Sequence, residues 1–288
     1  MVGQDSEFRK LQVTGGSTII VSLPKEWIKS NDLKKGDVVS LEELASGDLR
    51  LSPLQGPAMK QIVSIDCCTY ETGLIDLMIG AYLSGADVIK VSCEGEISRK
   101  TRANVRDFLR DTRGMEIEHD DEKEIRIVSI LNPSELKLQV SINRMYILIS
   151  SLVRDALAVI EGEDVDLLSD IVERERQIDA RRLLLERQVA ASLQIPSVEK
   201  RLAVDRFTAM EHANIARVLE RMGDHATRLA SLVKEHSKVI KIGAEEMPLK
   251  AIPKWSKELK IIVHNMYTRD VGLIHSAKLK LAELRDDV

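Results

Sequence analysis

The sequence contains few aromatic residues and few cysteines. Aromatic side chains make up 3% of its 288 residues, a share that suits aliphatic helix packing better than a surface for stacking nucleobases. Of its three cysteines, Cys67 and Cys68 are adjacent and Cys93 is distant. This spacing predicts neither a disulfide framework nor a zinc motif, so we interpret all three as small residues of a hydrophobic core.

Long apolar runs and a strong charge excess are also missing. No window approaches the roughly 18 uninterrupted apolar residues of a membrane span, and the N-terminus lacks the basic and then apolar pattern of a secretory signal. We therefore expect a cytoplasmic protein without membrane insertion. Its 44% hydrophobic and 31% charged residues are typical of a soluble globular protein. A net charge of −4 argues against a general nucleic-acid binder, although a local contact surface stays open.

Familiar catalytic and phosphate-binding motifs are absent as well. The pair Gly15-Gly16 is too short for a phosphate-binding loop, and no His-Glu-x-x-His or Gly-x-Ser-x-Gly sequence occurs. Histidines such as His212 and His225 fall singly on predicted helices, where a histidine is more often structural than a ligand. We therefore expect a protein that is not an enzyme.

Residues 1–55 are predicted to form a small β domain. Apolar residues alternate on both sides of Gly15-Gly16, and a second hairpin is predicted around Gly47-Asp48. Pro24 opens a short helix between the two hairpins. A segment of about 45 residues with so few large apolar side chains does not easily bury a core by itself, so we expect it to form a homodimer.

Two motifs of this segment resemble the AbrB/SpoVT swapped-hairpin family. They are Leu23-Pro24-Lys25-Glu26 and Leu33-x-x-Gly36-Asp37, each beside a predicted strand. The resemblance implies a dimeric, DNA-binding β module.

Three basic residues of this module are the candidate DNA contacts: Arg9, Lys10 and Lys25. Basic side chains of this kind neutralise phosphates and make binding salt-dependent. Residues 1–53 nevertheless hold seven Lys or Arg against eight Asp or Glu, a net charge of −1. The alternative that this domain only dimerises the chain therefore remains open.

Residues 56–131 are predicted to form a small α/β sandwich with one helix-covered sheet. The predicted strands are 60–65, 88–91, 115–118 and 124–130, and the predicted helices are 71–84 and 98–110. The second helix is basic through Arg99, Lys100, Arg102, Arg106, Arg110 and Arg113. We interpret it as a solvated face, with contact to an anion or a nucleic acid as the alternative.

Residues 132–288 are predicted to be helical throughout. Apolar residues recur at helical spacing up to Gly162, and further helices are expected over 165–193, 198–236 and 256–285. A loop with Pro248 and Pro253 is expected before the last helix. Long helices joined by short loops indicate an antiparallel bundle.

Two pairs of carboxylates stand out in this helical segment. Glu175 with Asp179, and Glu220 with Asp224, are each four residues apart, so a helix places both members of a pair on one face. Two such pairs on neighbouring helices can form an oxygen-rich surface for a cation. Gly223 lies inside the second pair and weakens a helix by about 1 kcal/mol, which indicates that something approaches the backbone there.

Nearby arginines offer a simpler interpretation of the same residues. Arg217, Arg221 and Arg228 surround the second pair, and acidic and basic residues that alternate on a helix commonly form a solvated face.

The run Leu219–His225, Leu-Glu-Arg-Met-Gly-Asp-His, is similar to the Leu-Glu-Arg-Ile-Gly-Asp-His-Ala signature of PhoU proteins. Upstream, Val172–Asp179 resembles the other acidic motif of that family. The resemblance covers about residues 132–288. It implies a helical regulator of phosphate uptake that binds a metal ion, iron or zinc, through Glu175, Asp179, Glu220 and Asp224.

The sequence departs from the PhoU pattern in two respects. Only one of the two three-helix repeats of the family is recognisable, because the last predicted helix lacks an acidic motif. Arg228 also occupies a position where the family commonly has Asn.

Two functional hypotheses follow. The first is a phosphate-responsive regulator, in which a PhoU-like bundle contacts a transporter ATPase, a sensor kinase or DNA. The second is a structural scaffold with neither metal nor DNA binding, in which the carboxylates form surface salt bridges.

Overall fold

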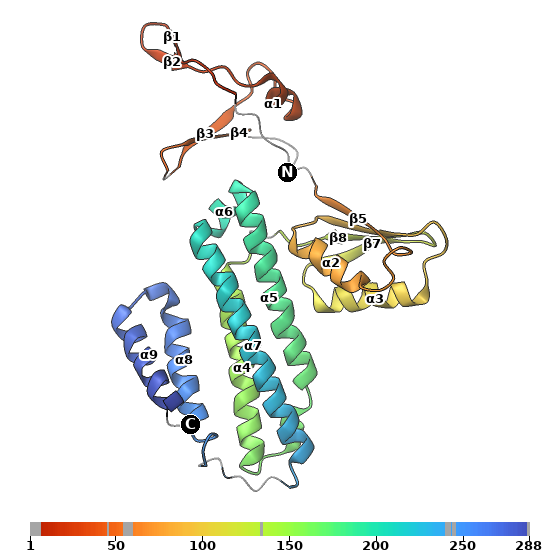
Figure 1. Cartoon of the computed structure of the whole chain (residues 1–288), viewed down its shortest axis with the longest axis vertical. Helices are drawn as coiled ribbons and strands as arrows, with labels where there is room; N and C mark the ends of the chain where they lie inside the picture. Colours follow the sequence, from red (N-terminus) through yellow and green to blue (C-terminus); the bar gives the residue numbers. More distant parts are fainter. Residues whose placement is uncertain are drawn as a thin grey trace. The chain divides into compact units, whose positions relative to one another are not determined.

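The computed structural model describes residues 7–44, 46–53, 60–132, 135–239, 243 and 246–286 (Figure 1). The chain divides into two compact units, residues 1–59 and residues 60–288. Among the helices of the described segments, none has the length and apolar character that crossing a membrane requires.

The first unit consists of two hairpins and one short helix. Strands β1 (Gln12–Thr14) and β2 (Thr18–Ile20) pair in antiparallel fashion, as do β3 (Val39–Glu43) and β4 (Leu49–Pro53), with α1 (Lys25–Ser30) between the hairpins. Gly15 and Gly16 make the first turn at φ of +60° and +93°, a conformation that glycine adopts readily. Both predicted hairpins and the predicted helix are confirmed.

No side chain described in this unit is buried. Phe8 is 96% exposed, and Leu11 and Val13 are exposed to 71% and 70%. Monomeric proteins rarely leave so much contiguous apolar surface in water. This is the arrangement expected of a unit that completes its core with another chain.

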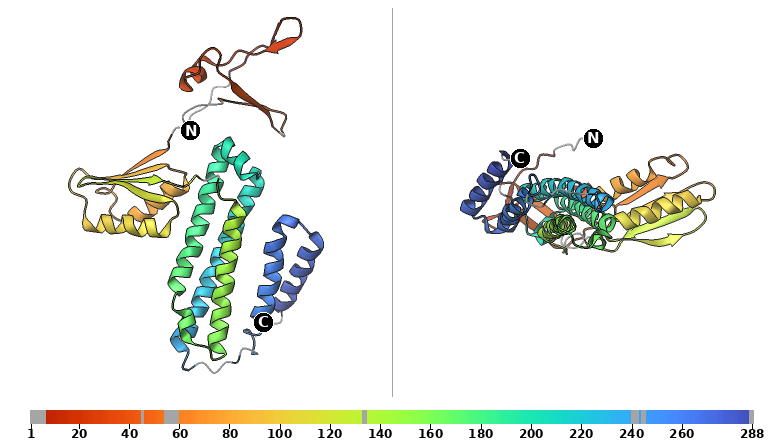
Figure 2. Two further views of the ribbon diagram at one scale, coloured as in Figure 1. Left: turned by 180° about the vertical axis from the view of Figure 1, so that it is seen from behind. Right: turned by 90° about the horizontal axis from the view of Figure 1, so that it is seen from below.

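The second unit begins with a four-stranded sheet and two helices. In chain order the elements are β5 (Ile62–Asp66), α2 (Leu74–Leu83), β6 (Val88–Ser92), α3 (Arg99–Asp111), β7 (Met115–Asp120) and β8 (Glu124–Ser129). The sheet order is β5-β6-β8-β7, with β5 and β6 parallel and the other pairs antiparallel. Both helices lie on the same side of the sheet (Figure 2). The predicted sheet with one helix-covered face is confirmed.

The interpretation of the cysteines is wrong for two of the three. Cys67 is buried and free, but Cys68 and Cys93 form a disulfide with a Cα–Cα distance of 5.6 Å. The pairing follows from the parallel strands, because Asp66 at the end of β5 is in register with Ser92 at the end of β6. Cys93 directly follows Ser92 and Cys68 comes two residues after Asp66. Sequence spacing alone does not reveal this register.

Helices make up the rest of the second unit. They are α4 (Leu138–Ile160), the 3-10 helix η1 (Val165–Leu168), α5 (Ile171–Gln194), α6 (Pro196–Leu202), α7 (Arg206–His236), α8 (Ala251–Thr268) and α9 (Val271–Asp286). Helices α4, α5 and α7 pack against one another with α5 antiparallel to the other two, and α8 packs on α4 (Figure 1). Their core consists of aliphatic residues such as Ile142, Leu152, Leu185 and Leu219.

Three of the long predicted helices are each interrupted by a break. In the helix expected over 165–193, the 3-10 helix η1 ends at Leu168 and α5 begins only at Ile171. The helix expected over 198–236 ends at Ala203, which is left-handed, and resumes after Asp205, whose side chain caps α7 by accepting from the Thr208 amide. The helix expected over 256–285 is split at Arg269, also left-handed, and α9 begins after Asp270. Pro253, expected in a loop, lies in the first turn of α8, where its missing N–H costs no hydrogen bond.

Arg187 on α5 joins the bundle to the α/β part of the second unit. Its side chain is 3% exposed, donates to the carbonyls of Tyr82 at 2.6 Å and Ala86 at 2.8 Å, and lies over the Tyr82 ring. Tyr82 lies in the last turn of α2 and Ala86 follows the end of the helix, so Arg187 caps the negative end of α2. Leu183, one turn earlier on α5, belongs to the core under the sheet.

Candidate metal centre

The approach of α5 to α7 positions the carboxylates. A Cβ atom on Gly223 of α7 would lie 3.1 Å from Cγ2 and 3.2 Å from Cδ1 of Ile178 on α5. Glycine therefore lets the two helices come closer than a larger residue would allow. The expectation of a close approach at Gly223 is confirmed, and the neighbours of this contact in the sequence are Asp179 and Asp224.

Three of the four predicted carboxylates converge beside this contact. One oxygen each of Asp179, Glu220 and Asp224 lies within 4.8 Å of the others. Asp179 and Glu220 are partly buried and Asp224 is exposed. Carboxylate oxygens this close repel one another unless a proton or a cation neutralises them.

Glu175 lies one turn before Asp179 on α5 and outside the group of three. It is partly buried, and its charge contributes to the rise in the pKa of Asp179. Its charge thus acts on the cluster from the next turn of the helix.

The electrostatics of the cluster act most strongly on Asp179. Burial, the Glu220 charge, and the smaller effects of Glu175 and Asp224 raise the pKa of Asp179 to about 6, and Arg182 opposes the rise. The protein alone thus leaves part of the negative charge of the cluster uncompensated.

The neighbouring arginines are arranged differently from the sequence-based interpretation. The counter-ion that reaches the cluster is Arg182 on α5, whose Nε lies 3.4 Å from Glu220 Oε1. Arg182 also pairs with Glu186 at 3.1 Å, and Arg217 pairs with the same Glu186 at 2.7 Å. Arg221 and Arg228 have no ion pair in the part of the chain that the structure describes. Only one arginine therefore competes with a cation for the cluster, and it divides its contacts between two carboxylates.

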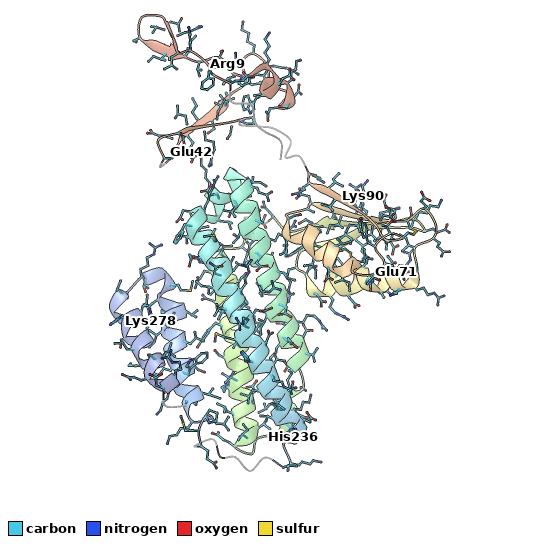
Figure 3. All side chains as sticks on the ribbon, viewed as in Figure 1. Arg9, Glu42, Glu71, Lys90, His236 and Lys278 are labelled. Atoms are coloured by element: carbon cyan, nitrogen blue, oxygen red, sulfur yellow. A yellow bond between two sulfur atoms is a disulfide. The ribbon has the colours of Figure 1, made fainter. Side chains whose placement is uncertain are left out.

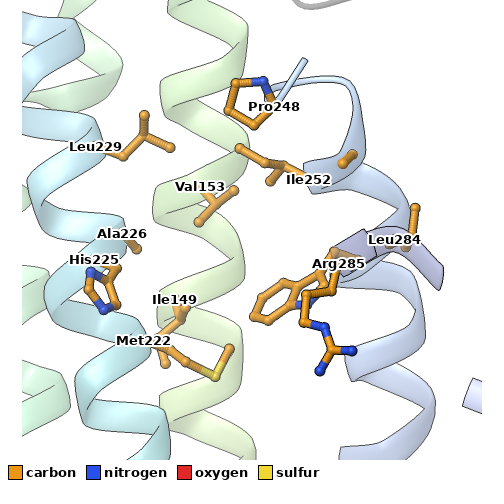
Figure 4. Close-up of a pocket in the computed structure, with 12 residues that line it drawn as sticks. Ile149, Val153, Met222, His225, Ala226, Leu229, Pro248, Ile252, Leu284 and Arg285 are labelled. Atoms are coloured by element: carbon orange, nitrogen blue, oxygen red, sulfur yellow. The ribbon is translucent and has the colours of Figure 1, made fainter. Parts of the chain in front are cut away.

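His225 lies away from the carboxylates. It lines an apolar cavity of about 540 Å³ between α4, α7 and the C-terminal helices, together with Ile149, Val153 and Leu229 (Figure 4). A residue next to Asp224 on a helix points roughly 100° away from it, and the structure follows that geometry.

The three candidate DNA contacts are all exposed in the first unit, where Figure 3 labels Arg9. Arg9 forms an ion pair with Glu7. Lys25 is the first residue of α1, after the Leu23-Pro24 turn. The basic side chains are thus accessible, and one of them already has an acidic neighbour.

The alternative basic surface on α3 is partly neutralised. Lys100 pairs with Glu71 at 3.4 Å, Arg110 pairs with Asp107 at 2.7 Å, and Arg102 pairs with Asp120. These pairs fit the interpretation of α3 as a solvated face better than that of a dedicated anion surface.

Comparison with known families identifies two parts of the chain. A family model described as PhoU domain matches residues 142–233, which include both carboxylate pairs. A second, described as Antidote-toxin recognition MazE, bacterial antitoxin, matches residues 12–58. The chain thus combines a PhoU domain with a MazE/AbrB-type domain, as the sequence motifs predict. No curated protein and no solved structure gave a match.

Proposed function

We propose that the chain is a regulator of phosphate homeostasis whose helical bundle binds a metal ion through Asp179, Glu220 and Asp224. The PhoU domain supports the regulatory role. The observation that carries the metal site is the convergence of three carboxylates from two helices within 4.8 Å. The raised pKa of Asp179 supports it, because a bound cation would supply the missing positive charge.

The ligand set bears on the choice of metal. Iron and zinc are the two candidates, and all three converging ligands are carboxylates. Zinc sites in proteins usually contain histidine or cysteine, whereas oxygen ligands suit harder cations. Iron is therefore the better fit, with Glu175 as the fourth carboxylate one turn away on α5.

The N-terminal unit is the part through which the regulator would dimerise. Its exposed apolar strands and its MazE/AbrB-type match support a homodimer. Arg9, Lys10 and Lys25 are the basic side chains through which such a dimer would contact DNA phosphates. The PhoU resemblance implies a phosphate transporter ATPase or a sensor kinase as the partner. The regulator would bind such a partner in the cytoplasm.

Metal analysis of the full chain, purified without an affinity tag or a chelator, tests the proposal. We expect stoichiometric metal in the wild type and none after the double substitution Glu220→Gln with Asp224→Asn. Iron present at 100 times its dissociation constant should stabilise the wild type by about 2.7 kcal/mol and leave the double variant unchanged. The matched control is Glu211→Gln with Glu235→Gln, which removes the same charge from exposed positions of α7.

The scaffold hypothesis predicts the opposite result. A wild type that is free of metal and shows no thermal shift with iron or zinc would reduce the carboxylates to partners of Arg182. Loss of metal in the Glu211 and Glu235 control as well would show that overall charge, not the cluster, retains the ion.

A further inference from the structure

A second cavity, which is polar, lies at the end of the bundle where α4 and α7 begin. It has a volume of about 290 Å³ and is lined by the start of α4, the break between α6 and α7, the first turns of α7, and the end of α8. None of the four acidic residues proposed as metal ligands lines it. Its size is near the lower limit of small-molecule sites in proteins.

The charges around the cavity favour an anion. Lys137 and Arg269 both line it, and neither forms an ion pair with any described residue. Asp205 is the one acidic lining residue, and its carboxylate is engaged in capping α7 through the amide and the hydroxyl of Thr208. The lining therefore has a formal charge of +1.

The first turn of α4 adds to this preference. Its N-cap residue is Lys137, which has no acceptor in its side chain, and no side chain caps the helix. An uncapped start of a helix of 23 residues presents free N–H groups and the positive end of the helix dipole. This alone would not identify a ligand.

One buried side chain indicates what the anion must carry. His212 is 9% exposed, and its Nδ1 lies 2.7 Å from the carbonyl of Thr208. Because a carbonyl only accepts, Nδ1 carries the hydrogen and Nε2 of the neutral ring is an acceptor. No described residue donates to that Nε2.

The cavity thus combines a net positive lining with an unpaired acceptor, Nε2 of His212. A buried acceptor without a partner is costly, so a matching ligand must be an anion that has its own hydrogen-bond donors. Phosphate keeps one or two protons near neutral pH, and its singly charged form offers two P–OH donors. Sulfate has the same shape but keeps no proton.

We propose that this cavity binds a protonated phosphate group, with Lys137, Arg269 and the start of α4 holding its oxygens and with His212 accepting a hydrogen bond from its P–OH. A single phosphate leaves room for bound water or for a small ester substituent. The site adds a phosphate ligand to the proposed regulator and does not depend on the metal.

Calorimetric titration of the full chain tests this, after metal has been removed with a chelator and at constant pH and ionic strength. We expect inorganic phosphate to bind about tenfold more tightly than sulfate, since sulfate leaves the His212 acceptor unpaired. Equal affinity for the two anions, or no binding of phosphate, would overturn the proposal. Glycerol phosphate distinguishes a phosphate ester from the free ion, because the free-ion site would exclude it.

Substitutions locate the binding. Lys137→Ala, at an exposed position, should weaken phosphate binding about tenfold, whereas Lys257→Ala on an exposed face of α8 should not change it. Unchanged binding in Lys137→Ala would place the anion elsewhere.

The result is separable from that for the metal. Phosphate binding should persist in the Glu220→Gln, Asp224→Asn protein, and its loss there would assign the anion to the carboxylate cluster instead. Metal binding without phosphate binding would remove only this second site.

Discussion

Asp179 is partly buried, has a raised pKa and is a proposed metal ligand. Its pKa of about 6 lies above the ordinary value of 3.8, so between these values the folded protein holds more protons than the unfolded chain. The free energy of unfolding of the metal-free protein therefore falls as the pH rises through this window. A cation should reverse the effect, because it binds the deprotonated cluster.

We predict that this dependence disappears in Asp179→Asn, which cannot ionise. Between about pH 5 and about pH 7, metal-free wild type should lose on the order of 1 kcal/mol of stability relative to the variant, after allowance for solvent screening. Denaturant titrations of both proteins at the two pH values, with a chelator present, measure the difference. Parallel curves would mean that Asp179 titrates as an ordinary surface carboxylate.

Gly223 permits a second prediction at the same scale. Alanine is favoured over glycine in a helix by about 1 kcal/mol, but the new Cβ would meet Ile178 at 3.1 Å, and overpacking of a core costs about 1–3 kcal/mol. Gly223→Ala should therefore destabilise the protein by about 1 kcal/mol and weaken metal binding, because α5 and α7 must separate.

Gly80→Ala is the matched control, since a Cβ at Gly80 in helix α2 meets nothing within 4 Å. It should stabilise the protein by up to about 1 kcal/mol. If both substitutions stabilise, the contact between Gly223 and Ile178 is not tight in solution.

The carboxylate cluster could be predicted largely from spacing, and its electrostatics could not. The positions Asp179, Glu220 and Asp224 follow from helical periodicity together with the motif around Gly223. That Arg182 rather than Arg221 reaches Glu220 depends on how α5 is rotated against α7, which no local pattern encodes. The same limit applies to Lys137 and His212, which line one cavity only because α4 and α7 begin side by side.

Among the elements, helix α5 has the most connections. One of its faces carries Asp179, and Arg187 two turns later caps α2 of the sheet region through two carbonyls. Burial lowers the pKa of Arg187. Its hydrogen bonds to the two carbonyls and its contact with the Tyr82 ring offset the cost of placing this charge inside the protein.

We predict that Arg187→Met loosens the α/β part from the bundle. The Ala86 carbonyl loses its donor, whereas the Tyr82 carbonyl keeps the Gly85 amide as a donor. The loss should cost about 1–3 kcal/mol, and urea unfolding should separate into two transitions. Arg228→Met, at an exposed position of α7, should change stability by less than about 0.5 kcal/mol. A single, unshifted transition in Arg187→Met would show that other contacts hold the two parts together.

The errors in the helix predictions arise because short capping signals interrupt a longer apolar periodicity. Apolar spacing continues across Ala203 and Arg269, and it therefore predicts one helix where two are present. The new starts are marked by two N-capping residues, Asp205 and Asp270. Asp205 accepts from the Thr208 amide, and Asp270 precedes Val271. The disulfide between Cys68 and Cys93 lay beyond sequence reasoning for a different reason. It joins cysteines 25 residues apart and depends on the pairing of the two strands that precede them.

At the scale of the whole molecule, the first unit is predicted to set the oligomeric state. Deleting residues 1–59 should leave the second unit folded, because the buried residues of its two cores lie between Ile65 and Val263. Light scattering should then report a drop from dimer to monomer. An unchanged number of chains per particle would show that the dimer interface lies in the second unit.

None of the described residues of the first unit is buried, and this affects when that unit is folded. A segment that gains its apolar contacts only from a second chain folds as it associates, so the folded fraction depends on the protein concentration. At low abundance most copies would carry open, protease-sensitive hairpins, and at high abundance most would be assembled. A regulator built in this way responds to its own copy number as well as to its ligands, so a change in its synthesis rate is itself a signal.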